Sequence, residues 1–439
     1  MIFALLFSAA AAVAPDFNSI DAAARQFMSN TKTPGVAVAI VRGSDVVYAK
    51  GFGVASLDAP SPVTADTLFQ IGSLTKVFTA ATILSLAAQG KIRLDVPVGN
   101  YVSGLNPSIA RLTASQLLSH TAGLKDEPAE YGSHDERAFA EYPRSWTSAY
   151  AILPPGTTFS YSNPGFTLAG LMAQETAGKP FPQLVEERVF TPLSMKHSTF
   201  RPTVAMTFPL AIGHRGARGE TPAVVRPMAE DTRHWPAGYI YTSANDLARF
   251  TIALLHDKAF HDLMTPRVEV SNELEPARYG YGLFLETYRG IPTAWHGGDM
   301  PGFTAMMRVL PGEDMALIVL ANRQAVRPDP ILDALLEALH RAPQSAAPKS
   351  QPAIPMTAAE MKTYAGRYVN RFPIELFVRD GRLWVRRPDD EHAVEKIGEQ
   401  RFTTDPARTF RPAEFEIFPA TAQRPAYVNM FVWAFVKEQ

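Results

Sequence analysis

The stretch FQIGSLTKVFTA, residues 69–80, carries a serine and a lysine three positions apart within an apolar run that is compatible with a helix. Residues three apart on a helix lie one above the other, so Ser73 and Lys76 are expected to be neighbours. Burying a lysine ammonium costs free energy unless the group is paired or neutral. The pattern therefore indicates either a solvated surface pair or a chemically active one.

The composition limits the kinds of protein that the chain can be. With 439 residues, of which 46% are hydrophobic, it is long enough for one large domain and a smaller one. A formal net charge of −1 does not indicate nucleic-acid binding. The absence of cysteine excludes disulfides and cysteine nucleophiles. The sequence also lacks the G-x-S-x-G motif of α/β-hydrolases and the H-E-x-x-H motif of zinc hydrolases.

Residues 1–14, MIFALLFSAAAAVA, predict an export signal because they are apolar, too short to span a bilayer, and end in small residues. No lysine or arginine precedes the apolar run, and Pro15 would directly follow a cut at Ala14, so a buried N-terminal helix is the alternative. No later segment has the apolar length of a membrane helix. We therefore expect an exported protein, periplasmic or secreted, without stable membrane insertion.

Residues 15–341 read as one large domain. The strands GVAVAIV and VVYAKGFG flank the turn RGSD as a hairpin. A helix is predicted over 73–89, ended by Gly90, and others near 113–119, 166–177, 182–189 and 244–256. Late strands are expected at 281–287, 304–310 and 315–322. Strands from both ends of this region predict an antiparallel sheet flanked by helices, an α/β sandwich with a helical subdomain.

The remainder of the chain changes in character. Residues 342–355, APQSAAPKSQPAIP, lack periodicity and read as a linker rich in proline and alanine. Beyond it, a hairpin around Asp380-Gly381 and the strand-like segments EFEIF and YVNMFVWAFV predict a small β-barrel or sandwich domain over residues 356–439.

Two further segments carry polar residues in special surroundings. Tyr161 and Asn163 lie in PPGTTFSYSNPGF, which is too rich in turn residues to be the middle of a helix. In AWHGGDMPGF, His296-Gly297-Gly298 is expected at a strand edge, where the backbone can closely approach a ligand. The Y-x-N spacing is weak alone because it recurs at Tyr368 with Asn370 and at Tyr427 with Asn429.

Together, in this order and spacing, these motifs resemble the serine β-lactamases and penicillin-recognising D,D-peptidases, particularly the class C-like branch that includes esterases and D-aminopeptidases. The resemblance covers roughly residues 20–340 and includes LLSHTAGL at 117–124 and PAGYIYTSANDLARF at 236–250. The C-terminal segment resembles the lipocalin-like barrel appended to some of these hydrolases.

The resemblance implies a role for each motif residue. Ser73 is the acylated nucleophile, Lys76 and Tyr161 share its deprotonation, and Asn163 orients the substrate amide. His296, Gly297 and Gly298 line the substrate, and the backbone N–H groups of Ser73 and Asp299 hold the acyl oxygen. Lowering the pKa of Tyr161 to near neutrality would require about 4 kcal/mol of favourable interaction, which a cationic Lys76 in a low-dielectric site could supply.

Many members of this family have lysine where this chain has His296, and histidine is only partly charged near neutral pH. This difference favours esters, amides or peptides with D-configured residues over β-lactams. We therefore predict a serine hydrolase that acts on a small-molecule or short-peptide acyl substrate, with no metal and no cofactor. The alternative is a protein of the same fold that has lost activity and binds cell-wall peptides or a partner.

Overall fold

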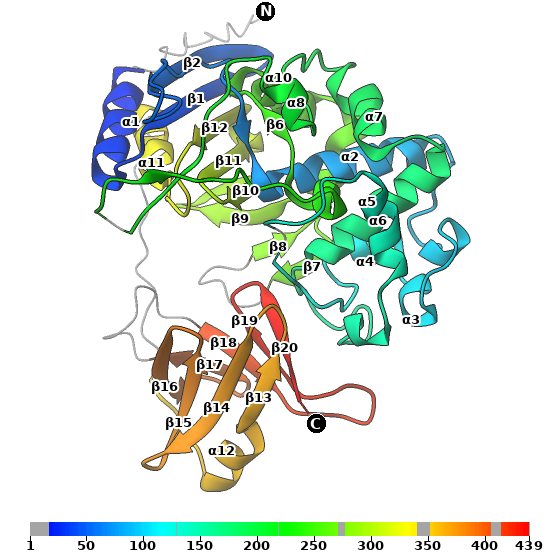
Figure 1. Ribbon diagram of the computed structural model, residues 1–439. Coiled ribbons are helices and arrows are strands. Elements are labelled where there is room, and N and C mark those ends of the chain that lie inside the picture. Colours follow the sequence, from blue (N-terminus) through cyan, green and yellow to red (C-terminus); the bar gives the residue numbers. More distant parts are fainter. Residues whose placement is uncertain are drawn as a thin grey trace, which may run out of the picture.

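The computed structural model describes residues 17–128, 130–217, 219–270, 277–339, 352–404 and 414–438. An eight-stranded antiparallel sheet with helices on both faces forms the larger part, and a closed barrel of eight strands lies beside it (Figure 1). The helices are α1 Asn18–Thr31, α2 Thr75–Ala88, α3 Pro107–Ala110, α4 Ala114–Leu118, α5 Arg137–Arg144, α6 Asn163–Ala177, α7 Phe181–Val185, α8 Pro202–Ala205, α9 Trp235–Gly238, α10 Ala244–His256, α11 Asp329–Ala338 and α12 Ala358–Tyr364.

The strands of the large sheet come from both ends of the first domain, which confirms the predicted architecture. Their order is β2-β1-β12-β11-β10-β9-β8-β7. Their bounds are β1 Gly35–Arg42, β2 Asp45–Gly53, β7 Val268–Val270, β8 Ala277–Tyr279, β9 Phe284–Tyr288, β10 Ile291–Met300, β11 Phe303–Leu310 and β12 Met315–Ala321. Two short pairs, β3 Phe69–Gln70 with β6 Tyr241–Thr242 and β4 His214–Arg215 with β5 Ala223–Val224, lie outside it.

Both faces of the sheet are buried at β1, which explains why this strand reads as a continuous apolar run. Alternate β1 residues point to opposite faces: Ala37 and Ala39 pack toward α2 and α10, whereas Val36 and Val38 pack toward α1 and α11. The two helical layers lie on opposite sides of the sheet in Figure 1. The α2 side holds the larger core, and the residues of FQIGSLTKVFTA belong to it.

Several predicted elements have different bounds in the structure. The helix expected from Ser73 begins as a 3₁₀ turn, η1 Gly72–Leu74, and becomes α-helical only at Thr75. The strand expected from residue 281 begins at Phe284, because Gly282 turns the chain with a φ of +83°. The helix expected over 182–189 is α7 followed by a π-helical turn, η4 Glu186–Phe190.

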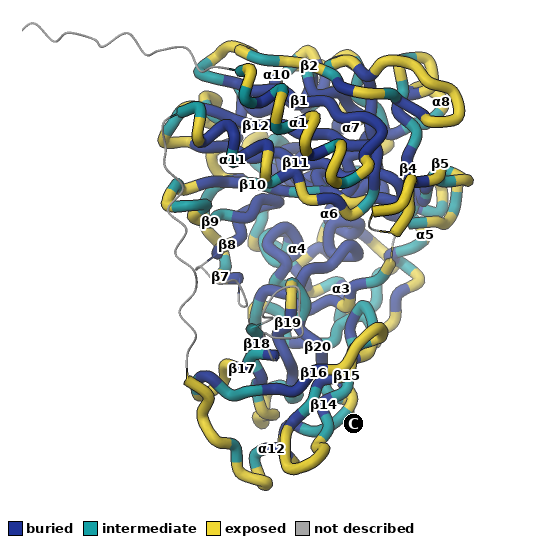
Figure 2. The backbone as a smooth tube through the Cα atoms, turned by 90° about the vertical axis from the view of Figure 1, so that its left-hand side faces the viewer, coloured by how far each residue is buried: buried dark blue, intermediate teal, exposed yellow. Residues whose placement is uncertain are grey.

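The C-terminal domain is a closed barrel rather than a sandwich. Its strands are β13 Gly366–Val369, β14 Pro373–Arg379, β15 Arg382–Arg387, β16 Asp390–Lys396, β17 Arg401–Thr404, β18 Glu414–Phe418, β19 Tyr427–Met430 and β20 Trp433–Lys437, and β13 pairs with β20 to close it. The segment predicted as one strand over 427–436 is a hairpin that turns at Phe431, whose φ is +58°. Figure 2 shows that β19 and β20 are mostly buried.

The predicted export signal lies outside the described residues, as does most of the predicted linker. The described end of the linker is attached to the barrel, because Ile354 N–H donates to the Lys396 carbonyl at 2.7 Å. Within the described ranges, the structure contains no helix that is long and apolar enough to cross a membrane.

Candidate active site

Ser73 lies in η1, at the point where the chain enters α2. Gly72 precedes it with a φ of +51°, a conformation that glycine adopts without strain. A Cβ atom at Gly72 would lie only 2.9 Å from the Asp299 backbone nitrogen, so β10 passes directly over this turn. The turn thus holds the Ser73 hydroxyl and its backbone N–H beside the end of β10.

Lys76 is fully buried one turn further along. Its Nζ lies 3.0 Å from Ser73 Oγ, 2.8 Å from Asn163 Oδ1 and 2.7 Å from the carbonyl oxygen of Ala237. Burial lowers the pKa of Lys76 to about 7. A neutral amine that donates its two hydrogens to the Asn163 and Ala237 oxygens turns its lone pair toward Ser73, so Lys76 can accept the Ser73 proton.

Tyr161 contacts the same hydroxyl. Its side chain hydrogen-bonds to Ser73, and the Lys76 Nζ lies 4.8 Å from its ring centroid. Burial raises the pKa of Tyr161 above its usual value, which makes the tyrosine a proton donor at neutral pH. The sequence left open which of Lys76 and Tyr161 holds the proton; the raised pKa of Tyr161 favours the neutral phenol, and burial leaves Lys76 only partly charged near neutral pH.

His120 is a support for Tyr161. Its ring lies 4.2 Å from the Tyr161 ring, centroid to centroid, and its Nδ1 accepts a hydrogen bond from Ser162 N–H at 3.1 Å. The Ser162 hydroxyl in turn accepts from Gly165 N–H and caps α6. The helix cap therefore holds Asn163 in the first turn of α6, with its side-chain oxygen toward Lys76.

The end of β10 supplies backbone to the site. Strand β9 pairs with β10 only as far as Trp295, so residues 296–300 have β11 on one side and η1 on the other. A Cβ atom at Gly298 would overlap the carbonyl oxygen of Ile71, whereas one at Gly297 would make ordinary contacts at 3.5 Å. The Asp299 side chain accepts from Thr304 and Ala325, and the Asp299 backbone lies against the turn at Gly72, next to Ser73.

The surroundings of His296 disfavour a positive charge on its ring. It is buried between aromatic rings, its Nδ1–H donates to the Gly297 carbonyl, and its Nε2 lies 3.2 Å from the Tyr279 hydroxyl. Burial and the neighbouring Lys76 lower the pKa of His296 to about 3. The partly charged histidine expected from the sequence is thus neutral at physiological pH.

Asp126 is a buried residue of the site that the sequence did not reveal. Its Oδ1 accepts a hydrogen bond from Asn163 N–H at 2.8 Å, and its side chain is completely buried. It follows LLSHTAGL in a loop without regular structure, and no motif or spacing marks it. Its other partners belong to the barrel.

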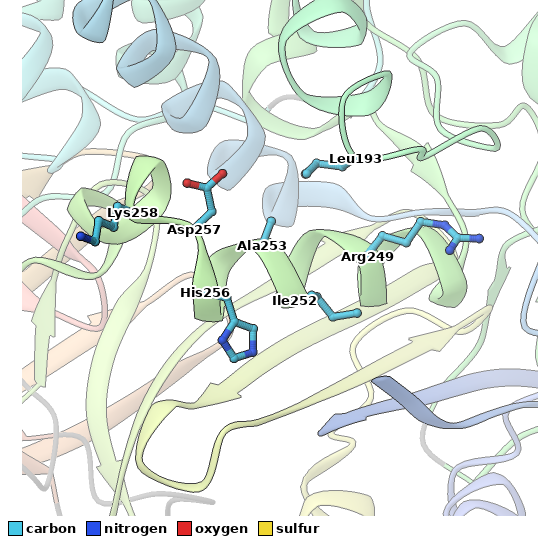
Figure 3. Close-up of a pocket in the computed structure, with 7 residues that line it drawn as sticks. All are labelled: Leu193, Arg249, Ile252, Ala253, His256, Asp257 and Lys258. Carbon is cyan, nitrogen blue, oxygen red and sulfur yellow. The ribbon is translucent and has the colours of Figure 1, made fainter. Parts of the chain in front are cut away.

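A separate hollow on the protein surface contains none of these side chains. It runs along α10 and is lined by Leu193, Arg249, Ile252, Ala253, His256, Asp257 and Lys258 (Figure 3). The candidate catalytic groups lie instead where η1, α6 and β10 meet.

Comparison with known proteins identifies the family of the chain. The beta-lactamase family model matches residues 20–342, so the chain belongs to this family, whose members share a serine hydrolase fold. Penicillin-binding protein 4 of Amycolatopsis lactamdurans is 29% identical over 316 residues, which cover 66% of this chain and 81% of that protein. Protein flp of Staphylococcus aureus (strain MW2) is 28% identical over 303 residues, which cover 66% of this chain but only 59% of that protein.

Two similar solved structures extend over the barrel as well. SurE has a TM-score of 0.79 and 23% identity, over 96% of this chain and 99% of that one. The octameric penicillin-binding protein homologue from Pyrococcus abyssi has a TM-score of 0.67 and 22% identity, over 96% of this chain and 100% of that one. D-alanine carboxypeptidase AmpC from Burkholderia cenocepacia covers 74% of this chain, with a TM-score of 0.60 and 23% identity. These likenesses establish the fold.

Proposed function

We propose that the protein is a hydrolase that transfers an acyl group first to Ser73 and then to water. The observation that carries this proposal is the buried Lys76 amine, whose Nζ lies 3.0 Å from Ser73 Oγ and whose pKa is lowered by burial to about 7. A serine hydroxyl becomes a good nucleophile when an adjacent base takes its proton. A lysine that served only to stabilise the fold would not need this partner.

The proton path follows from the two pKa directions. As Ser73 Oγ attacks the substrate carbonyl, its proton moves to neutral Lys76. Protonated Tyr161 donates its proton to the departing alcohol or amine and regains one from Lys76. In the second step, water attacks the Ser73 ester with its proton passing to the Lys76–Tyr161 pair, and Ser73 leaves as the restored hydroxyl.

The developing negative charge on the acyl oxygen needs preorganised donors. The backbone N–H groups of Ser73 and Asp299 are the proposed pair, because η1 and the end of β10 are in direct contact through Gly72 and Gly298. Asn163 completes the site as the acceptor that fixes Lys76, and its side-chain nitrogen lies 3.4 Å from the Glu127 carbonyl.

The substrate class that fits best is an ester, an amide or a short peptide with a D-configured residue. A neutral His296 offers no cation for a substrate carboxylate, which disfavours β-lactams. A solved complex of SurE with D-Leu and the D-alanine carboxypeptidase likeness support D-configured substrates.

A matched pair of assays tests this proposal. The rate of hydrolysis is measured for D- and L-alanine p-nitroanilides and for a small p-nitrophenyl ester, with Ser73→Ala as the control. We expect turnover of the ester and of the D-amide that the variant lacks. The alternative, a binding protein without activity, predicts no turnover and no covalent adduct at Ser73 in crystals soaked with a boronic acid.

A further inference from the structure

The barrel contacts the segment that carries Tyr161. The backbone N–H of Tyr161 donates to the Val432 carbonyl at 2.7 Å, in the turn between β19 and β20. Ser160 Oγ accepts from Ala434 N–H at 3.1 Å, and Thr158 Oγ1 accepts from the Asn429 side chain at 3.1 Å. The barrel therefore holds one side of the active site in position.

Asp126 is where this interface reaches the catalytic groups. Its Oδ2 accepts from Arg371 Nη1 at 3.0 Å and from Trp433 Nε1 at 2.9 Å, and both donors belong to the barrel. Its Oδ1 accepts from Asn163 N–H, and its own N–H donates to Asn370 Oδ1 at 2.7 Å. A buried carboxylate needs such donors, because an unpaired buried charge is costly.

Resting on the function proposed above, we infer that Asp126 and Arg371 are a positioning pair, through which the docked barrel sets the orientation of Asn163 and the charge balance around Lys76. Neither residue touches Ser73. They act through Asn163, which accepts a hydrogen bond from Lys76, and through their opposite charges.

The other titratable groups around Lys76 are either neutral near neutral pH or have other partners. Burial lowers the pKa of both His120 and His296, and it raises the pKa of Tyr161 and Tyr279, so all four are neutral there. The Glu127 carboxylate lies toward His234, 3.3 Å away, and the Asp299 carboxylate accepts from Thr304 and Ala325. The charges that remain are those of Asp126, which raises the pKa of Lys76, and Arg371, which lowers it.

The test is an NMR titration of the Lys76 side chain in the full chain labelled with ¹³Cε-lysine, with the resonance assigned by Lys76→Arg. Removing a negative charge destabilises the ammonium, so Asp126→Asn should lower the midpoint of Lys76 by roughly half a pH unit or more. Removing a positive charge does the reverse, so Arg371→Gln should raise it by a similar amount. Arg371→Lys should leave it near the wild-type value, and the double variant should lie between the two single variants.

The control is Arg367→Gln, which removes an exposed barrel arginine that is paired with Glu438. This variant should leave the titration midpoint of Lys76 unchanged. Unchanged midpoints in both single variants, or shifts in the same direction, would overturn the inference. If Asp126→Asn does not fold, the test is the difference in Lys76 midpoint between Arg371→Gln and Arg371→Lys, and equal midpoints would overturn the inference.

The rate of fluorophosphonate labelling at Ser73, followed against pH in the same variants, separates this inference from the proposed function. No labelling of the wild type would contradict the hydrolase proposal even if Lys76 shifts as expected. Labelling whose pH midpoint is the same in all variants would contradict the coupling through Asp126 and leave the hydrolase proposal standing.

Discussion

At the scale of single residues, the sequence identifies which side chains meet but not their protonation states. The S-x-x-K spacing and the Y-x-N motif predicted a cluster, and the structure brings Ser73, Tyr161 and Asn163 together around Lys76. The pKa of each group depends on desolvation by the whole fold. This is why the expected partly charged His296 was wrong, and why the sequence could not assign the proton between Lys76 and Tyr161.

The pH dependence of Ser73 labelling tests the assignment of Lys76 as the base. Lys76 must be neutral to accept the proton, and its pKa is about 7. The labelling rate should therefore fall about tenfold per pH unit well below pH 7 and level off above it. A rate that instead rises only above pH 9 would identify Tyr161 as the base. In Lys76→Arg, whose guanidinium stays charged, labelling should fall at least about a hundredfold at every pH.

The neutrality of His296 makes a separate prediction about substrates. A cationic histidine would favour a substrate with a free carboxylate as the pH falls below its usual pKa. Because the pKa of His296 is about 3, the kcat/KM ratio for an acid substrate and its methyl ester should stay constant between pH 5.5 and 8. A ratio that rises severalfold toward pH 5.5 would show that a cation binds the carboxylate.

At the scale of elements, the contact between β10 and η1 is so close that it leaves no room for a side chain at Gly298. A side chain at Gly298 would overlap Ile71, so Gly298→Ala should destabilise the protein by roughly 2 kcal/mol and reduce Ser73 labelling. Gly297→Ala is the matched control for stability, because its Cβ would make only ordinary contacts. Thermal unfolding of both variants measures the difference, and equal melting temperatures would contradict the described packing.

The elements that the sequence predicted well are those with strong periodicity or turn residues. The hairpin of β1 and β2, helix α10, and the Asp380-Gly381 turn follow the expected bounds. The β19–β20 turn at Phe431 and Val432 contains neither glycine nor asparagine, so no local signal marked it. It forms because β19 and β20 pair within the barrel and because the Val432 carbonyl accepts from Tyr161.

At the scale of the whole molecule, the barrel and the catalytic domain share buried polar contacts that a sequence does not disclose. Asn370 and Asn429, which weakened the Y-x-N motif by repeating it, are among the residues that dock the barrel. Asn370 hydrogen-bonds Asp126 and Ser160, and Asn429 hydrogen-bonds Thr158. Pairs so distant in sequence carry no local pattern, so the sequence predicted two domains without their interface.

Because the barrel contacts residues next to the active site, we predict that weakening its docking also slows the reaction at Ser73. Asn370→Ala removes hydrogen bonds to Asp126, Ser160 and Ala434, so it should lower the free energy of unfolding by about 1–3 kcal/mol and slow Ser73 labelling. The control is Asn245→Ala, which removes an exposed hydrogen bond to Asp66 and should change little. Chemical denaturation and labelling rates measure both effects, and wild-type labelling in Asn370→Ala would contradict a role of the docking in the site.

The proposed chemistry depends above all on an activated Ser73. Intact-mass analysis and peptide mapping after reaction with a small fluorophosphonate test it directly, with Ser73→Ala and Tyr161→Phe alongside the wild type. We predict one adduct on Ser73, which is absent in the first variant and forms more slowly in the second. No adduct in the wild type, or an adduct on another serine, would mean that the fold serves binding rather than hydrolysis.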